Sequence, residues 1–194
     1  TMKVLAAVRD KVLDPRRMRA LGFCVSIEHA EYMARRFTEA GIPAVAVSAN
    51  TTSPERDAAL RQLRSGDVNV VFAVDLFNEG VDVPAIDTVL FLRPTESATV
   101  FLQQLGRGLR HSPDKDGLTV LDFVGRQHQK FRFDQRFAAI THSTRREIAE
   151  QVEAGFPSLP AGCSIDLDRD VQRLVIESLK AALPTTRRQR AAEL

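Results

Sequence analysis

The chain has 194 residues, 44% of them hydrophobic and 27% charged, which is typical of a globular protein with one large domain or one domain and an appendage. Its formal net charge of +2 does not by itself indicate a nucleic-acid-binding protein, and its two distant cysteines, Cys24 and Cys163, argue against a disulfide scaffold or a zinc site. Because the sequence has neither a ~20-residue apolar run nor the pattern of a signal peptide, we expect a cytoplasmic protein that does not enter a membrane.

The first part of the chain predicts a lead-in segment followed by an alternation of strands and helices. Residues 1–20 are polar, can form a helix and do not indicate an independent fold. Residues 22–27 are a short apolar run with β-branched side chains and predict a buried strand. Residues 28–40 have apolar side chains at helical spacing and end at Gly41, so they predict an amphipathic helix. Residues 43–47 predict a second strand.

The next helix is expected to begin after Ser53. Serine is a favourable N-cap, Pro54 suits the first turn, and Glu55 places negative charge at the positive end of the helix. The helix is expected to end at residues 65–66. Further apolar runs predict strands at residues 68–74, 87–92 and 118–123, with a helix over residues 97–109 between the last two.

Apolar strands that alternate with helices predict an α/β fold, in which a parallel sheet is covered by helices on both faces. In such sheets, ligands bind at the carboxyl ends of the strands. Four polar segments directly follow predicted strands, at residues 26–29, 48–52, 75–84 and 93–97. Their placement predicts a functional site at that edge of the sheet.

Residues 124–194 predict a mostly helical C-terminal extension of a domain formed by residues 21–123. The extension begins with interleaved basic and aromatic side chains, among them Arg126, Lys130 and Arg132. This mixture could bind phosphates and stack on bases, or it could form the basic face and the core face of one helix. Further helices are expected over residues 144–154 and 168–182.

Residues 103–110, Gln-Gln-Leu-Gly-Arg-Gly-Leu-Arg, are the most informative stretch of the chain. On a helix, Gln103, Arg107 and Arg110 would share one face, and planar guanidinium groups are suited to phosphate oxygens. Each of the two glycines costs the helix ~1 kcal/mol relative to alanine, which favours close approach of the backbone to a neighbouring surface. A solvated basic helix is the alternative interpretation.

Three segments together resemble helicase motifs. Residues 23–29 resemble motif IV, residues 74–84 resemble motif V, and residues 103–110 match the motif VI pattern Gln-x-x-Gly-Arg-x-x-Arg at every fixed position. In this order, they make residues 20–123 similar to the C-terminal RecA-like domain of a superfamily 2 helicase, which has a P-loop NTPase-type fold. The full sequences of residues 74–82 and 103–110, together with residues 159–163, are similar to those of bacterial DEAD/DEAH-type helicases. These helicases often carry a phospholipase-D-like nuclease domain upstream.

The resemblance implies the second motor domain of an ATP-dependent nucleic-acid helicase or translocase. Arg110 would be the arginine finger, which stabilises charge on the γ-phosphoryl group during its transfer. Arg107 would contact the phosphates or a carboxylate of the partner domain. The other residues implied at the nucleotide are Gln103, Gly80, Asp82 and Glu79. For Glu79 and Asp82, an ordinary loop turn is the alternative.

The resemblance also implies contacts with nucleic acid through loop hydroxyls and backbone N–H groups, which bind phosphates without reading bases. The candidate residues are Ser26, His29, Thr95 and Ser97. Each could instead be a local helix cap, and Ser97 precedes a predicted helix. The partner is expected to be DNA rather than RNA, although phosphate contacts carry little of that distinction.

The sequence departs from the family pattern in three ways. Val74 stands where motif V commonly begins with a threonine, and residues 48–50 are Ser-Ala-Asn where many relatives have His-Gly-Asp. The chain also has no phosphate loop and no Asp-Glu-x-His-like magnesium site. We therefore expect ATP to be shared with an upstream RecA-like domain in cis, Mg²⁺ to be bound by that domain rather than by this chain, and the chain alone to be inactive. The alternative is a non-catalytic RecA-like module that binds nucleic acid or protein.

Overall fold

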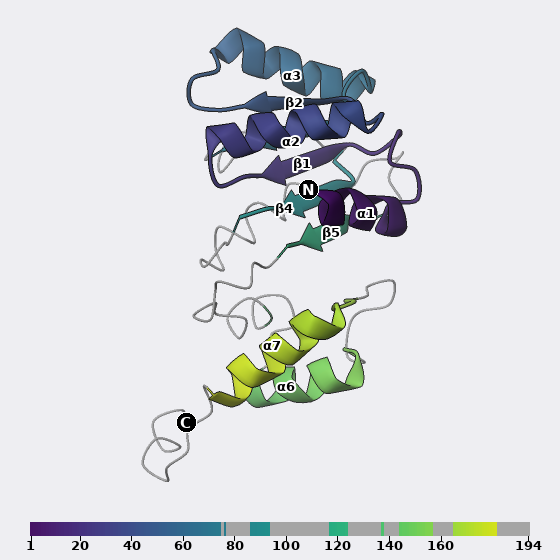
Figure 1. Ribbon diagram of the computed structural model, residues 1–194, viewed down its shortest axis with the longest axis vertical. Helices are drawn as coiled ribbons and strands as arrows, with labels where there is room; N and C mark the ends of the chain where they lie inside the picture. The colour runs from purple at the N-terminus through teal and green to yellow at the C-terminus, as the bar shows by residue number, and fades with distance from the viewer. Residues whose placement is uncertain are drawn as a thin grey trace. The chain divides into compact units, whose positions relative to one another are not determined.

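A parallel sheet lies at the centre of the first part of the protein. The computed structural model describes residues 1–74, 76, 86–93, 117–123, 137, 144–156 and 165–181. Within these residues, five strands pair in the order β2-β3-β1-β4-β5, and every pair is parallel (Figure 1). Their bounds are Ala20–Phe23 for β1, Ala44–Val47 for β2, Val70–Ala73 for β3, Thr88–Phe91 for β4 and Thr119–Asp122 for β5. The predicted α/β fold with a parallel sheet is confirmed.

Helices pack on both faces of this sheet. They are α1 (Met2–Lys11), α2 (Ile27–Glu39) and α3 (Ser53–Ser65). Side chains from α1 and α2 share one buried cluster with Phe72, whereas side chains from α3 share the other with Val71. Adjacent residues of a strand point to opposite faces, so α3 covers the face opposite to α1 and α2.

Two pairs of aromatic rings lie in this core, one between a helix and a strand and one between two strands. On the α2 face, Phe37 and Phe72 meet edge to face with their ring centroids 5.0 Å apart. On the α3 face, Phe23 and Phe91 stack with centroids 5.6 Å apart. All four rings are fully buried. Each such pair contributes about 0.5–1.5 kcal/mol beyond the burial of its apolar area.

The lead-in segment is helical, as its sequence allows, and it is part of this core. Helix α1 buries Val4, Leu5 and Val8 in the same cluster as α2 and β1. The chain then reaches β1 through Arg19, whose backbone N–H donates to both carboxylate oxygens of Asp87 at 3.0 and 3.1 Å. These contacts fix the amino ends of β1 and β4 to each other.

Two predicted boundaries were wrong, and helix capping explains both. The first strand ends at Phe23 rather than at residue 27, because Ser26 is the N-cap of α2. Helix α3 is capped by Thr52 rather than by Ser53: the carboxylate of Glu55 accepts from the backbone N–H of Thr52 at 2.9 Å and from its hydroxyl at 2.7 Å. The end of this helix at Gly66, in the left-handed region with φ 89°, is as predicted.

The structure divides into two compact units, Thr1–Thr95 with Thr99–Gly125, and Glu96–Ala98 with Arg126–Leu194. In the second unit, α6 (Arg145–Ala154) and α7 (Arg169–Ala181) confirm the helices predicted for the extension. Helix α6 begins with a capping box between Thr144 and Glu147. Ile148 of α6 and Val175 of α7 are fully buried.

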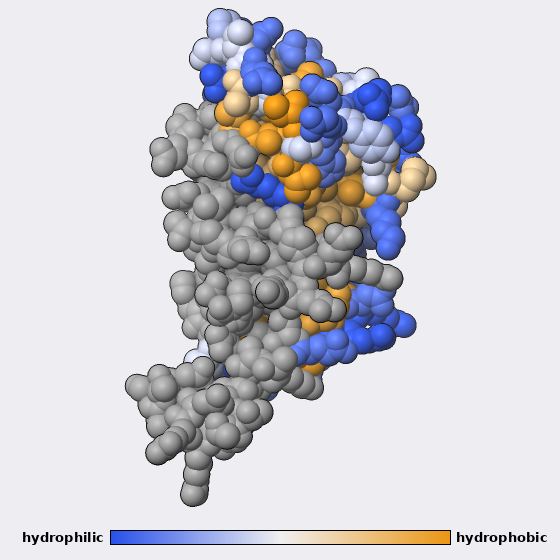
Figure 2. Space-filling model, turned by 60° about the vertical axis from the view of Figure 1, so that its left-hand side comes forward, coloured by the Kyte–Doolittle hydropathy of each residue, from blue (hydrophilic) through white to orange (hydrophobic). Residues whose placement is uncertain are grey.

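Within the described residues, no helix is long and apolar enough to cross a membrane. In Figure 2, a group of hydrophobic residues of the first unit is visible between hydrophilic ones. The strand arrows of Figure 1 end at the carboxyl side of the sheet. This side of the sheet is where the sequence predicts the functional site.

Candidate nucleotide and nucleic-acid interface

The register of the sheet brings three of the predicted segments to neighbouring positions. Phe23, the last residue of β1, pairs with Ala73 of β3 on one side and with Phe91 of β4 on the other. The backbone continues these pairings beyond the strand ends, because Cys24 N–H donates to Ala73 O at 2.9 Å and Leu92 N–H donates to Phe23 O at 3.0 Å. The segments that resemble motifs IV and V and the segment before motif VI therefore begin side by side.

Ser26 connects β1 to α2 as a helix cap. Its Oγ accepts a hydrogen bond from the backbone N–H of His29 at 3.2 Å. The Ser26 hydroxyl also bonds the carboxylate of Glu28, and the pKa of Glu28 is lowered by this bond and, more strongly, by a backbone hydrogen bond. The capping alternative is thus confirmed for Ser26, whose hydroxyl is engaged within the first turn of α2. A contact between Ser26 and nucleic acid stays a prediction.

His29 is half-buried in the first turn of α2. Burial lowers the pKa of His29. Its Nδ1 atom is buried and has no hydrogen-bond partner among the described residues. Neutral imidazole is the form favoured at neutral pH, so His29 would meet a phosphate as a hydrogen-bonding group rather than as a cation.

The segment after β2 forms a compact turn held by hydroxyl groups. Ser48 is buried and donates its N–H to Thr51 Oγ1 at 2.9 Å, while Asn50 donates its N–H to Ser48 Oγ at 3.2 Å. The side chain of Asn50 is left at the exposed surface. Sequence reasoning did not single out Thr51, although a hydroxyl residue three positions after Ser48 is typical of such turns.

Val74, at the first position of the motif V resemblance, has an apolar role in the structure. It is half-buried against the cluster that joins the sheet to α1 and α2, and its backbone N–H donates to Val47 O at 3.3 Å. The side chain that replaces the usual threonine therefore packs into the core.

Arg93 is a charged residue at the carboxyl edge of the sheet that was not among the predicted site residues. Burial raises the pKa of the Cys24 thiol to about 12, and the positive charge of Arg93 acts on the same thiol in the opposite direction. The guanidinium of Arg93 is thus near the end of β1, although it follows β4. The only indication in the sequence was that Arg93 directly follows the apolar strand predicted at residues 87–92.

Eight of the predicted site residues lie outside the described residues and stay predictions. They are Glu79, Gly80, Asp82, Thr95, Ser97, Gln103, Arg107 and Arg110. In the described part of the chain, no group of three or more His, Cys, Asp or Glu side chains is arranged to hold a metal ion.

Comparisons with known proteins place this geometry in a family. Residues 3–112 match the helicase conserved C-terminal domain. The chain is 36% identical over 121 residues to the "51.5 kDa protein" of a Lactococcus phage, covering 62% of this chain and 26% of that protein. It is 35% identical over 103 residues to "Putative ATP-dependent helicase IRC3" of Saccharomyces cerevisiae, covering 53% and 15%. The chain therefore spans about a quarter or less of these relatives.

A solved structure shows the same fold. The C-terminal domain of the DEAD-box protein Dbp5 aligns with a TM-score of 0.55 at 14% identity, covering 93% of this chain and 89% of that one. At this identity the likeness shows the fold alone. The family match covers more than half of the sequence and includes all three motif segments. The chain belongs to the helicase conserved C-terminal domain family, and its fold is that of the C-terminal RecA-like domain of superfamily 2 helicases.

Proposed function

We propose that this chain is the second motor domain of an ATP-dependent nucleic-acid helicase or translocase. The observation that carries the proposal is the family match over residues 3–112, which ends just beyond the motif VI resemblance at residues 103–110. The sheet supports it, because the segments after β1, β3 and β4 leave the same edge side by side. A ligand bound at that edge would meet all of these segments.

The side chains of the proposed site suit an anionic nucleotide rather than a metal ion. Motif VI supplies two guanidinium groups, Arg107 and Arg110, and Arg93 adds a cation at the described edge. The sequence contains neither a phosphate loop nor an Asp-Glu-x-His-like magnesium site. We therefore assign the phosphate loop and the Mg²⁺ ligands to an upstream RecA-like domain in cis.

Bound ATP supplies a γ-phosphoryl group whose transfer to water releases the free energy that a motor uses. Arg110 is assigned the role of arginine finger. Its guanidinium stabilises the negative charge on the oxygens of the γ-phosphoryl group during transfer. Arg107 holds the phosphates or a carboxylate of the upstream domain, and Gln103 orients this face. Gly80 is assigned a tight turn in motif V, Asp82 a contact with the ribose or with a motif VI arginine, and Glu79 the role of an acidic partner for the arginines.

Nucleic acid is assigned to the loops at the same edge. Ser26 and His29 lie at the start of α2, and Thr95 and Ser97 precede motif VI in sequence. Backbone N–H groups and hydroxyls in such positions bind phosphates irrespective of base sequence. We propose that the domain binds DNA in preference to RNA.

The test is the ATPase activity of the full-length protein, measured with single-stranded DNA, with RNA and without nucleic acid. Replacing Arg110 by alanine should lower the stimulated rate by ~10³ to 10⁵ while nucleic-acid affinity stays unchanged. Arg61→Ala, which removes an exposed arginine from α3, is the matched control and should leave the rate unchanged. The 194-residue chain alone should hydrolyse no ATP.

Two results would contradict the proposal. If the Arg110→Ala protein kept full ATPase activity, Arg110 would not be the arginine finger. A full-length protein that folds and binds nucleic acid but has no ATPase activity would indicate the non-catalytic binding module instead.

A further inference from the structure

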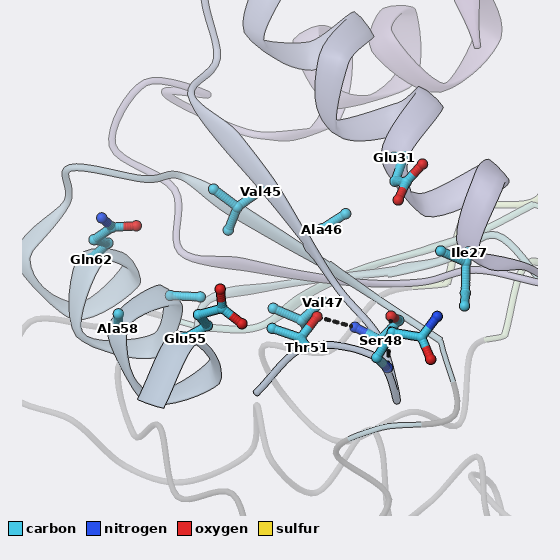
Figure 3. A pocket seen from close by; sticks show the side chains of 12 residues that line it. Ile27, Glu31, Val45, Ala46, Val47, Ser48, Thr51, Glu55, Ala58 and Gln62 are labelled. Atoms are coloured by element: carbon cyan, nitrogen blue, oxygen red, sulfur yellow. Dashed lines mark hydrogen bonds between the residues drawn. The ribbon is translucent and has the colours of Figure 1, made fainter. Parts of the chain in front are cut away.

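A groove runs along the outer side of β2, between α2 and α3 (Figure 3). It has a volume of about 470 Å³. Ile27 and Glu31 line it from α2, Val45 and Ala46 from β2, and Glu55 and Gln62 from α3. We call it the β2-edge groove. One end of the groove reaches the turn after β2, at Ser48, Asn50 and Thr51, and the rest of it lies along β2.

The outer edge of β2, which is the edge not paired with β3, faces the groove. Among the described strands, β2 pairs only with β3. Pro43 O and Val47 O accept hydrogen bonds from the β3 side, from Val70 N–H and Val74 N–H. Because successive residues of a strand present their backbone groups to opposite edges, Ala44 and Ala46 face outward.

Two threonine hydroxyls cover the ends of this outer edge. Thr38 Oγ1 accepts from Ala44 N–H at 3.1 Å and donates to Ala44 O at 3.3 Å. At the other end, Ser48 N–H donates to Thr51 Oγ1 at 2.9 Å. Among the described residues of β2, Ala46 is thus the one with outward N–H and C=O groups that neither threonine hydroxyl engages. A single residue of an extended peptide could accept from one and donate to the other.

The walls of the groove have one sign of charge. Glu31 and Glu55 are the charged residues among its twelve lining residues, and no lysine or arginine is among them. Hydrogen bonds from the hydroxyl and the backbone N–H of Thr52 lower the pKa of Glu55, which is therefore ionised at neutral pH. Carboxylates on both walls repel the phosphates of nucleic acid and attract a lysine or arginine side chain.

The two faces of β2 also define which side chains fit. The methyl group of Ala46 packs on the face covered by α2, whereas Val45 and Val47 pack on the face covered by α3. A residue paired with Ala46 would place its side chain on the α2 face, where Glu31 lies. Its two neighbours would place theirs on the α3 face, over the apolar surface of Val45 and Ala58.

We propose that the β2-edge groove binds an extended segment of a partner protein, in which one lysine or arginine is flanked by aliphatic residues. The basic residue pairs its backbone with Ala46 and its side chain with Glu31, and the aliphatic neighbours cover Val45 and Ala58. The threonine hydroxyls at Ala44 and Ser48 confine the pairing to this register.

The test uses the full-length protein with ¹⁵N-labelled alanine and the blocked peptide acetyl-Val-Lys-Val-amide. The backbone amide signal of Ala46 should shift on titration with saturation. The same peptide with glutamate in place of lysine should bind more weakly, and so should one whose central nitrogen is methylated and cannot donate to Ala46 O. Glu31→Gln should weaken the lysine peptide by about two- to fivefold without affecting the glutamate peptide.

The peptide controls keep the test independent of protein folding. Equal binding of the lysine and glutamate peptides, or full binding of the N-methylated peptide, would overturn the proposal. So would the absence of any shift at Ala46. A shift of Ala46 caused by higher protein concentration alone, or by a single-stranded oligonucleotide, would assign the groove to a second copy of the chain or to nucleic acid instead.

Discussion

Gly22 and Phe72 are paired residues of β1 and β3, and the phenyl ring of Phe72 fills the space that a side chain on Gly22 would need. A Cβ atom added to Gly22 would lie 2.6 Å from Cε1 of Phe72, closer than carbon atoms pack. The same ring contacts Phe37 of α2 edge to face. Glycine at position 22 therefore allows the aromatic core to close over the central strand.

Replacing Gly22 by alanine should lower the free energy of unfolding by about 1–3 kcal/mol, because Phe72 is fully buried and its ring has to move. Urea unfolding measures this loss. Gly117→Ala is the matched control, since an added methyl there meets no atom within 4 Å, and it should change stability by less than about 0.5 kcal/mol. Equal stability of the two variants would contradict the close approach of Gly22 to Phe72.

The capping box of α3 gives a second prediction. Thr52→Ala removes the hydroxyl that bonds Glu55 and should cost about 1 kcal/mol at pH 7, whereas Ser53→Ala should be nearly neutral. The bonds from Thr52 hold the pKa of Glu55 below its ordinary value of 4.5. Their stabilisation is therefore present above that value and is lost as the pH falls through the lower pKa of the folded protein.

Urea unfolding at several pH values tests this prediction. The difference between wild type and Thr52→Ala should be full at pH 7 and should shrink as the pH falls below about 4.5. A larger effect from Ser53→Ala than from Thr52→Ala would contradict the observed cap.

The periodicity of the sequence was sufficient to predict the parallel sheet, the helices on both faces and the two helices of the extension. Capping decided the boundaries that were wrong. Ser53 and Thr52 are both acceptable caps by type, and the choice depends on which one lies three residues before Glu55. Likewise, the apolar run through Ile27 contains a strand and the first residue of a helix, which apolar character alone does not separate.

The candidate site was less predictable than the fold. The segments at the carboxyl edge follow from the order of strands and loops, but their neighbours depend on the strand order β2-β3-β1-β4-β5, which the sequence pattern does not specify. Arg93 acts on Cys24 because β4 pairs with β1, and the two residues are far apart in sequence. The β2-edge groove also depends on the strand order, because it forms only if β2 is an edge strand of the sheet.

Cys24 should be unreactive toward thiol reagents in the native protein. It is fully buried, and burial raises its pKa to about 12, so almost none of it is thiolate at pH 8. In a Cys163→Ser variant, Ellman's reagent at pH 8 should modify Cys24 only after urea is added. Cys24→Ser reports on Cys163 in the same way. Rapid native modification of Cys24 would contradict its burial.

The raised pKa of Cys24 also predicts a loss of stability at alkaline pH. The unfolded thiol ionises near its ordinary value of 9.0, while the folded thiol stays protonated. The contribution of Cys24 to stability is therefore complete below that value and decreases as the pH rises above it. Between pH 8 and about 10, unfolding by urea should become easier for wild type than for Cys24→Ala, relative to their difference at pH 7. A constant difference would contradict the pKa shift.

The basic start of the C-terminal extension is open to a test in the full-length protein. If Arg126, Lys130 and Arg132 bind phosphates, replacing all three by alanine should reduce the slope of log affinity against log salt concentration. The reduction expected for three lost phosphate contacts is about 2 on single-stranded nucleic acid and nearly 3 on duplex DNA. Fluorescence anisotropy of a labelled oligonucleotide at several salt concentrations measures the slope.

The matched control removes the same charge from exposed positions on the first unit, at Arg16, Arg17 and Arg61. Its slope should remain close to that of wild type, because counterions are released only where a cation meets a phosphate. An equal reduction in both variants would attribute the effect to net charge. An unchanged slope in the Arg126, Lys130 and Arg132 variant would favour the alternative in which these side chains form the solvated face of a helix. Salt dependence thus separates the two interpretations, since a solvated face releases no counterions when nucleic acid binds elsewhere.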